Sequence, residues 1–293
     1  MAVRERGEIV KEPMARKKVA LCDVKATSLI TLHARALQSR WANPILPDPW
    51  AAEAVAQLDY NFAAFKVGIW MASLVAARAR QLDSWTNDFL AQQPECNVLH
   101  LACGLDSRVF RVNPSASVAW FDVDFPEVVA LRQRLYPERA GCRVIASPLS
   151  NLDWLREVPV DRPTLIVAEG LVMYLTEDEL KQLFSRFIDH SGTGQLAFDS
   201  HSRQAVQKLR EKKWSVRGTG ATFQWGLGDA AEVTKLDPRL ALMTERQAHQ
   251  LTGFRRAPWR ARLLIRALDL VPALRMMRCV RCRFGSDWPS PTG

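Results

Sequence analysis

The chain has 293 residues, of which 48% are hydrophobic and 24% are charged. This is the composition of an ordinary globular protein, and it excludes an intrinsically disordered chain. No run approaches the roughly 20 apolar residues that are needed to span a bilayer, so we expect no membrane partner. The formal net charge of +9 is typical of proteins that bind nucleic acid, unless it is confined to one segment.

The positive charge is concentrated near the end of the chain. Residues 253–284 contain nine arginines and one acid, Asp269, and therefore account for +8 of the net charge. Because the rest of the chain is close to neutral, a general surface for polyanions is not implied. We expect a solvated arginine face rather than an RNA groove, and no nucleic-acid partner.

The N-terminus and the cysteines indicate a cellular compartment. Residues 1–26 begin with mixed charges and no apolar core, so we expect a flexible leader rather than a signal peptide. Of the six cysteines, three lie in or beside apolar runs, which suits the reducing cytoplasm. Cys279 and Cys282 form a single CxxC without a second pair or nearby histidines, so we predict no metal site.

The periodicity of apolar residues predicts helices in the first third of the chain and a sheet after it. Prolines at 44, 47 and 49 separate a first helical region from a second, which is predicted over Trp50 to Gln92. Further helices are predicted from Pro126 through Leu135 and over Glu177–Ile188, where Thr176 and Glu179 form a capping box. Five strands are predicted, at Val98–Ala102, Val118–Val123, Arg143–Ala146, Thr164–Ala168 and Gln195–Phe198. Continuous apolar strands that alternate with helices indicate a parallel sheet covered on both faces.

The last third of the chain is less regular. Residues 201–242 interrupt the alternation and are rich in glycine and aromatic residues, which fits either a lid over an acceptor or a packing subdomain. Thr244 is predicted to cap a helix that stops at Gly253, and Arg278–Phe284 is predicted to be a final strand. Residues 27–293 then form a single domain, divided into a helical cover at 27–93, a cofactor-binding core at 94–200, the insertion at 201–242 and a C-terminal part at 243–293.

Small and acidic residues gather where the predicted strands end. The first strand runs into a loop in which Gly104 permits a tight turn, although no GxGxxG motif or Walker loop is present. Asp122 and Asp124 end the second strand, and Glu169 follows the fourth. Ligands bind at the carboxyl ends of strands in such sheets, and three acids there suit a cationic nucleoside better than a pyrophosphate. Each acid could also cap a helix.

Three motifs carry a resemblance to a known family. VLHLACGLDSRVFR at 98–111, WFDVDFPEVV at 120–129 and VAEGLVMYL at 167–175 are similar to motifs of the leucine carboxyl methyltransferase-like superfamily. TLHARAL at 31–37 and ARARQLD at 77–83 resemble its N-terminal helices. In order and spacing, these motifs look most like those of the bacterial O-methyltransferases of the tetracenomycin polyketide type. The resemblance covers residues 27–200 and continues more loosely to Phe284.

The resemblance implies a fold and a cofactor. The fold is the α/β class I methyltransferase (Rossmann-like) architecture, with a seven-stranded, mostly parallel sheet, a reversed final strand, an N-terminal helical cover and an insertion after strand five. The cofactor is S-adenosyl-L-methionine. The implied cofactor-binding residues lie in the helical cover and at the ends of the strands; they are Arg35, Arg78, Ala102, Gly104, Asp124, Leu149 and Glu169.

These residues have different implied roles. Arg78 falls where the family's arginine binds the methionine carboxylate, a pairing suited to guanidinium, and Arg35 is similar to a basic residue at the same end. Asp124 matches the acid that binds the ribose, and Glu169 the acid near the α-ammonium group. Leu149 lies where the adenine is contacted.

Two positions depart from the family pattern. Ala102 stands where the family has glycine, which adds a methyl group beside the methionine moiety. Pro148 stands where the family has an aspartate, so a partner for the adenine amino group is missing unless backbone or Ser150 replaces it. Both departures predict weaker cofactor binding, and they support an alternative in which the chain binds the cofactor without catalysis.

The predicted reaction is methyl transfer to an oxygen, a phenol or a carboxylate, of a small aromatic or polyketide-like acceptor. A phenol, with a pKa of about 10, benefits from a base, and His201, at the end of the fifth strand, is the best-placed candidate. Tyr174 is a candidate for orienting the acceptor. Both residues also have ordinary structural interpretations: His201 as a polar residue at the rim of the sheet, and Tyr174 as a packing residue. The alternatives are a protein carboxyl methyltransferase and, less well supported, an RNA-modifying methyltransferase or a nicotinamide oxidoreductase. The oligomeric state is not predicted.

Overall fold

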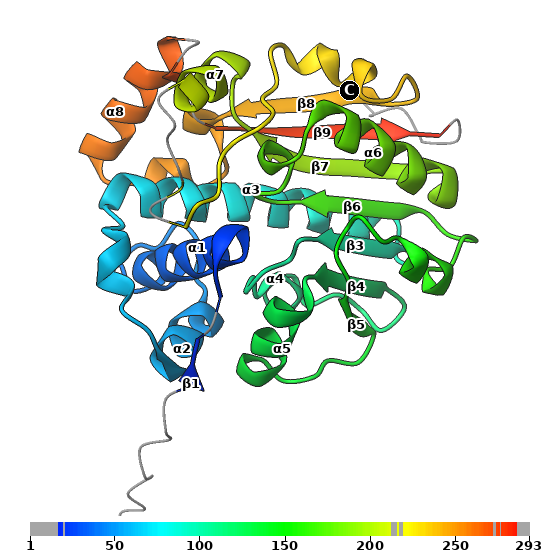
Figure 1. Ribbon diagram of the computed structural model, residues 1–293, viewed down its shortest axis with the longest axis horizontal. Helices are drawn as coiled ribbons and strands as arrows, with labels where there is room; N and C mark the ends of the chain where they lie inside the picture. Colours follow the sequence, from blue (N-terminus) through cyan, green and yellow to red (C-terminus); the bar gives the residue numbers. More distant parts are fainter. Residues whose placement is uncertain are drawn as a thin grey trace, which may run out of the picture.

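The structure is a computed structural model that describes residues 17–19, 21–211, 216, 219–271, 274–275 and 277–285. Its centre is a seven-stranded sheet with the order β5-β4-β3-β6-β7-β9-β8 (Figure 1). The strands are β3 (Asn97–Leu101), β4 (Ala119–Asp124), β5 (Cys142–Ala146), β6 (Thr164–Ala168), β7 (Gly194–Ser200), β8 (Ala241–Gln247) and β9 (Arg278–Phe284). The five predicted strands and the final strand are therefore confirmed to within two residues at each end.

The topology of the sheet is that of the predicted fold. Strands β3 to β7 pair in parallel. Strand β9 inserts antiparallel between β7 and β8, and within the described residues it is the one reversed strand of this sheet. The class I methyltransferase architecture, with a single reversed strand near one edge, is confirmed.

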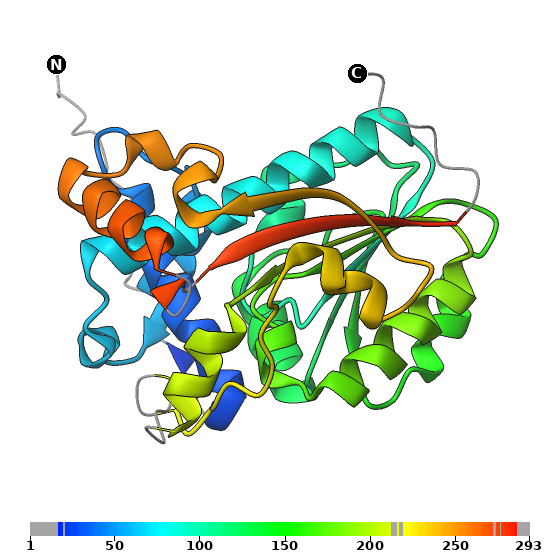
Figure 2. The ribbon, with the colours of Figure 1, turned by 90° about the horizontal axis from the view of Figure 1, so that it is seen from above.

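Helices cover both faces of the sheet (Figures 1 and 2). The helices are α1 (Asp23–Ser39), α2 (Pro49–Gln57), α3 (Ile69–Gln92), α4 (Arg108–Val112), α5 (Pro126–Leu135), α6 (Glu177–Ser191), α7 (Arg203–Glu211) and α8 (Trp259–Leu270). Short 3-10 helices lie at Phe62–Phe65, Asp153–Glu157, Val172–Tyr174, Ala230–Lys235, Ala248–Gln250 and Phe254–Arg256. Helix α6 begins at the predicted capping box, in which the Glu179 backbone N–H donates to Thr176 Oγ1 and Glu179 accepts from the Thr176 N–H. None of the described helices is long and apolar enough to cross a membrane.

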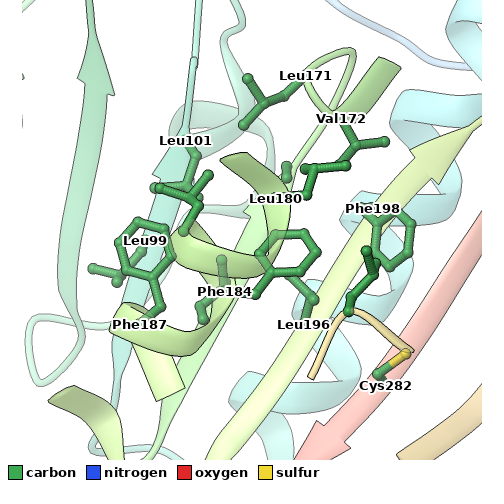
Figure 3. Close-up of a cluster of buried hydrophobic side chains, with 14 of the residues drawn as sticks. Leu99, Leu101, Leu171, Val172, Leu180, Phe184, Phe187, Leu196, Phe198 and Cys282 are labelled. Atoms are coloured by element: carbon green, nitrogen blue, oxygen red, sulfur yellow. The ribbon is translucent and has the colours of Figure 1, made fainter. Parts of the chain in front are cut away.

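The core follows from the alternation of side chains along the strands. On one face, Leu99, Leu196 and Phe198 pack against Phe184 and Phe187 of α6 (Figure 3). On the other face, the neighbouring strand residues pack against α3 and α8; these strand residues include Val98, Trp120, Leu165, Val167 and Ala197. Both faces of the central strands are thus buried, which is why their sequences are continuously apolar.

The N-terminal cover differs from the prediction in two places. The flexible leader was predicted to extend to residue 26, but Lys17–Lys18 pairs in parallel with Leu58–Asp59, and α1 already begins at Asp23. Residues 1–16 lie outside the described residues. The single helical region predicted over 50–92 is interrupted at 58–68, where Lys66 adopts a left-handed backbone with φ 47°.

The prediction of a helix from Thr244 to Gly253 was wrong. Residues Ala241–Gln247 form strand β8, and a short 3-10 helix at 248–250 follows it. Their amino acids favour helix by intrinsic propensity, but β8 pairs with the neighbouring strand β9, and tertiary pairing outweighs such weak preferences. The 201–242 segment was predicted to be either a lid over an acceptor or a packing subdomain, and it has features of both. Leu227, Ala230 and Val233 pack in the core, whereas Gly220–Gln224 line the cavity at the carboxyl ends of the strands.

Candidate active site

The carboxyl ends of the parallel strands open onto a cavity of about 770 Å³. Residues that follow β3, β4, β5, β6 and β7 line it from the sheet, and α1 and α3 line it from the cover. Residues Gly220–Gln224 and Met277 complete the wall. This is the edge at which ligands bind in open parallel sheets. All nine residues predicted for the site line this single cavity: Arg35, Arg78, Ala102, Gly104, Asp124, Leu149, Glu169, Tyr174 and His201.

The loop after β3 is held by a carboxylate from the next strand. The backbone N–H of Gly104 donates to Asp124 Oδ2 at 2.6 Å, and that of Phe125 donates to Asp124 Oδ1 at 2.7 Å. Gly104 has φ 56°, and Ala102 has φ 47°, a conformation that strains a residue with a Cβ. Burial raises the pKa of Asp124 against the effect of these two donors.

Asp122 does not lie at the cavity, although the strand-end pattern predicted three acids there. Its carboxylate is buried two residues before the end of β4. It accepts hydrogen bonds from Arg132 and from the indole N–H of Trp120, and it pairs with His100. Burial opposes ionisation, but Arg132 and His100 bring the pKa of Asp122 down to about 2. Asp122 is therefore a structural anion, and the acids that line the cavity are Asp23, Asp106, Asp124 and Glu169.

Arg78 connects the cover to the ends of two strands. Its Nε donates to Glu169 Oε1 and its Nη1 to Asp199 Oδ2, each at 2.9 Å. Asp199 also accepts from the Gly170 backbone N–H at 2.6 Å. The second terminal nitrogen, Nη2, forms no hydrogen bond with the described residues. One edge of this cavity-lining guanidinium is therefore fixed and the other remains available to a ligand.

Arg35 is held more completely by the protein. Its Nε donates to Asp48 Oδ2 at 3.1 Å and its Nη2 to the Leu105 carbonyl at 2.8 Å, and the residue is 1% exposed. The structure thus brings Arg35 to the predicted end of the cavity, but its donors are engaged in supporting the loop after β3.

These arginines belong to a buried network of alternating charge. Arg108 pairs with Asp83, Asp106 and Glu169, and Arg111 pairs with Asp48, Asp83 and Asp106. Burial alone would raise the pKa of Glu169, but Arg78 and Arg108 outweigh it and lower that pKa. The described network has four guanidiniums (Arg35, Arg78, Arg108 and Arg111) and five carboxylates (Asp48, Asp83, Asp106, Glu169 and Asp199), so it carries an excess of one negative charge beside the cavity.

The end of the cavity beside β4 and β5 is formed by Ser147–Ser150. The Ser147 N–H donates to the Asp124 carbonyl at 2.9 Å, which fixes this loop against the acid. Leu149 is half-buried and packs on the core, and Pro148 contributes no N–H. The missing aspartate is not replaced by another acid among the described residues that line this end of the cavity.

The opposite end is apolar and aromatic. Phe223 lies between two of the predicted residues: its ring centroid is 4.6 Å from that of His201, edge-on, and 5.4 Å from that of Tyr174. Trp70, Met71, Leu74 and Met277 also line the cavity, and Met71 packs against the hydrophobic cluster that contains Phe223. Burial and the charge of Arg78 lower the pKa of His201 to about 3, and burial raises the pKa of Tyr174 to about 12. Both side chains are therefore neutral at physiological pH.

His201 Nδ1 is buried and has no hydrogen-bond partner among the described residues. An unpartnered buried polar atom is costly unless a ligand or water satisfies it. Because His201 also lines the cavity, Nδ1 is a candidate partner for a polar group of a ligand. The sequence identified His201 only by its place at a strand end. It gave no sign that Nδ1 would lack a hydrogen-bond partner.

Several residues of the network were missed in the sequence. Asp83, Asp106 and Arg108 lie within the motifs that carried the family resemblance, but they and Asp48 received no role. The signal that would have found them is a charged residue within an otherwise apolar helix or strand, because burial of such a residue requires a partner of opposite charge. Asp83, for example, lies on the largely buried helix α3.

Cys279 and Cys282 lie on opposite faces of β9. Cys279 packs with the α3 side of the core and Cys282 with the α6 side. The two thiols therefore cannot share a metal ion, and no cluster of three metal-ligating side chains occurs within the described residues. All six cysteines are free thiols.

The sheet order, the single reversed strand and the acid-lined cavity at the carboxyl edge define a class I methyltransferase. A family model, leucine carboxyl methyltransferase, matches residues 28–188. The chain belongs to this family.

Curated relatives extend the match. The chain is 44% identical over 224 residues to the tetracenomycin polyketide synthesis O-methyltransferase TcmP of Streptomyces glaucescens, covering 76% of this chain and 82% of that one. It is 34% identical over 276 residues to the S-adenosyl-L-methionine-dependent methyltransferase dpfgK of Gibberella zeae, covering 86% and 92%. The protein is an S-adenosylmethionine-dependent methyltransferase.

A solved structure agrees with the fold. A DUF574 family protein from Streptomyces avermitilis superposes with a TM-score of 0.55 over 88% of this chain and 97% of that chain. Because the two sequences are only 14% identical, this likeness bears on the fold alone.

Proposed function

We propose that this methyltransferase transfers the methyl group of S-adenosylmethionine to a hydroxyl oxygen of a small aromatic or polyketide-like acceptor. The observation that carries the proposal is the apolar end of the cavity, where one unpartnered histidine nitrogen lies among aromatic side chains. The name of the Streptomyces relative, an O-methyltransferase of polyketide synthesis, supports the same acceptor class. The free thiols support a cytoplasmic location.

The cavity residues complement the cofactor in charge. S-adenosylmethionine, when bound, supplies an electrophilic methyl group and carries a net charge of +1 from its sulfonium, ammonium and carboxylate groups. The excess negative charge of the buried network complements that cation. Arg78 Nη2 would bind the carboxylate, Glu169 would face the ammonium group, and Asp124 would accept from the ribose hydroxyls.

The contacts of Asp124 and Gly104 support this assignment. The left-handed backbone at 102 and 104 turns the chain sharply at the cavity edge, where alanine and glycine keep the side chains small. A Cβ added at Gly104 would lie 3.2 Å from Ser28 Cβ of α1, which shows how closely the cover approaches this loop. Leu149 would contact the adenine, with Pro148 providing apolar surface and no hydrogen bond.

His201 would act on the acceptor by hydrogen bonding. Its lowered pKa keeps the imidazole neutral, so that Nδ1 can accept a hydrogen bond from the acceptor hydroxyl and direct the oxygen lone pair at the methyl group. A histidine with so low a pKa is a weak general base, so its contribution is chiefly alignment. Tyr174 and Phe223 would hold the ring of the acceptor and exclude water from the reacting atoms.

The experiment that tests this proposal compares acceptors of two kinds. The purified protein is incubated with S-adenosylmethionine and either a panel of polycyclic phenols or their carboxylic acid analogues, and the products are identified by mass spectrometry. The proposal predicts methyl ethers from the phenols. Methyl esters alone would favour a carboxyl methyltransferase. Cofactor binding by calorimetry without turnover on any acceptor would favour the non-catalytic alternative.

A further inference from the structure

Helix α8 exposes apolar side chains on its outer face. Its inner face, formed by Ala261, Ile265 and Asp269, is buried against the core. On the outside, Trp259 and Leu263 are each 63% exposed and Leu270 is 80% exposed. At 3.6 residues per turn these three positions lie within about 40° of one another around the helix. They form a continuous stripe, which we call the α8 stripe, that points away from the protein.

Arginines without counter-ions flank this stripe. Arg262 and Arg266 lie on one side of it around the helix and Arg260 on the other, with the Arg260 guanidinium 5.2 Å from the Trp259 ring centroid. Arg255 and Arg256 precede the helix. Within the described residues none of these five arginines forms an ion pair with a carboxylate, because the one acid of 255–275, Asp269, is buried and binds His249.

Some exposed arginines elsewhere in the protein form ion pairs, whereas others, such as Arg186, form none within the described residues. Arg143 pairs with Glu157 and Arg156 with Asp153, although these side chains are more than half exposed. What distinguishes the cluster at α8 is that five arginines without an ion pair among the described residues gather on and just before one helix. It combines these five positive charges with exposed tryptophan and leucine.

The α8 stripe lies on the outside of the molecule and near the cavity. Both ribbon views place α8 at one corner, beside the first half of α3 (Figures 1 and 2). The first residues of α3, Ile69 and Trp70, are also exposed, by 59% and 41%, and Trp70 lines the cavity. The apolar surface of this corner thus includes a residue that lines the cavity.

We propose that α8 docks this protein on the surface of an anionic phospholipid membrane. A helix with leucine and tryptophan on one face and flanking arginines lies in the plane of such an interface, with the apolar side chains in the acyl boundary and the guanidiniums at the phosphates. The stripe lies on the outer face of α8, and the one acid of that helix, Asp269, is buried, so α8 exposes no carboxylate to fix the register of a protein partner. Two copies meeting through it would bring like charges together.

The expectation of no membrane partner came from the lack of a spanning segment, and surface docking does not need one. Docking at α8 would bring the corner that contains Trp70 close to the lipid. An aromatic acceptor of low water solubility is concentrated in a membrane, so such contact would favour its transfer to the cavity. The proposal itself stands on α8 alone and is independent of the acceptor.

The test is sedimentation of the full chain with lipid vesicles at low ionic strength. Vesicles contain either phosphatidylcholine alone or phosphatidylcholine and phosphatidylglycerol in equal amounts. We expect binding to the mixed vesicles, little to phosphatidylcholine alone, and release by salt. Replacing three arginines (R260Q, R262Q and R266Q) is expected to weaken binding to the mixed vesicles by about 100-fold, because each positive charge near the surface contributes about fivefold in affinity. The control replaces three exposed arginines elsewhere (R143Q, R156Q and R186Q) and is expected to bind like the unmodified protein.

A second pair of variants tests the apolar part. The variant W259S/L263Q/L270Q is expected to lose at least about tenfold in affinity for mixed vesicles, whereas V160Q/L242Q, which changes exposed apolar residues elsewhere, is expected to bind normally. Circular dichroism melting and cofactor binding check that each variant is folded. Absence of binding to the mixed vesicles, or equal loss in the test and control variants, would overturn the proposal. Failure to bind vesicles, together with a dimer that W259S/L263Q/L270Q dissociates in sedimentation velocity, would show that the stripe joins two copies instead.

Discussion

Arg78 of α3 donates from Nη1 to the buried carboxylate of Asp199 at the end of β7, at 2.9 Å. The two residues are 121 positions apart in the chain, and their contact fixes the helical cover to the strand that precedes His201. Asp199 is fully buried, so burial raises its pKa, and Arg78 acts in the opposite direction. The orientation of the proposed carboxylate-binding guanidinium thus depends on a strand at the acceptor end.

The first prediction concerns that guanidinium. Lysine at 78 keeps the charge but cannot reach Glu169 and Asp199 together and still present a donor to a ligand. We expect Arg78→Lys to weaken S-adenosylmethionine binding at least tenfold in calorimetry, with a lowered melting temperature. Arg80→Lys is the control, because Arg80 lies on the same helix but binds the Ile45 carbonyl outside the cavity. Equal affinities in the two variants would remove Arg78 from the site.

The second prediction concerns the loop after β3. Both oxygens of Asp124 accept backbone N–H groups, from Gly104 and Phe125. An asparagine retains one acceptor and turns its amide N–H₂ toward the other donor, at a cost of about 1–3 kcal/mol. We expect Asp124→Asn to weaken cofactor binding about tenfold or more, whereas the exposed Asp153→Asn leaves it unchanged. Normal affinity of Asp124→Asn would contradict the assignment.

The third prediction is a dependence of stability on pH. The pKa of His201 is about 3 in the folded protein and about 6.5 when unfolded. Below pH 6.5 the unfolded chain therefore takes up a proton that the folded chain does not, and stability falls as the pH falls. Between pH 7 and pH 5 this contribution is about 2 kcal/mol.

The variant His201→Gln removes that contribution. We expect urea unfolding of the variant to lose about 2 kcal/mol less than the unmodified protein between pH 7 and pH 5. Methyl transfer by the variant should be reduced mainly in kcat, because the cofactor contacts lie elsewhere in the cavity. An identical pH dependence of stability in both proteins would show that His201 is not buried as a neutral imidazole.

The fourth prediction concerns Ala102. Its φ of 47° costs about 1 kcal/mol for a residue with a Cβ, and glycine relieves this strain while adding entropy to the unfolded chain. We expect Ala102→Gly to be neutral or to stabilise by up to about 1 kcal/mol, and to bind S-adenosylmethionine more tightly. Ala146→Gly in the extended strand β5 should instead destabilise by about 0.5–1 kcal/mol. A clear loss of stability in Ala102→Gly would contradict the role of backbone strain.

The parallel core and the ends of its strands could be predicted from the sequence, for a physical reason. Strands buried on both faces must be continuously apolar, and the ligand edge of such a sheet is fixed by the direction of its strands. Strand order therefore predicted that Asp124 and Glu169 lie at this edge, and both line the cavity there. The capping box at Thr176 is likewise a local signal that needs no tertiary contact.

The errors arose where a distant partner decides the outcome. Strand β8 has a helix-favouring composition, and only its pairing with β9 makes it a strand. Asp122 fits the pattern of a strand-end acid, yet Arg132 of α5 neutralises it inside the protein. The free nitrogen of His201 and the exposed stripe of α8 are likewise properties of the folded chain, which no periodicity indicates.

Transfer of a labelled methyl group tests the central claim most directly. The protein is incubated with S-adenosylmethionine that carries a trideuteromethyl group and with a phenolic acceptor that it methylates, and product is followed by mass spectrometry at saturating acceptor and limiting cofactor. We predict that the label appears on the acceptor oxygen and that Arg78→Lys and Asp124→Asn, although folded, lose most of this activity. Undiminished transfer by both variants, with cofactor affinity unchanged, would contradict the account.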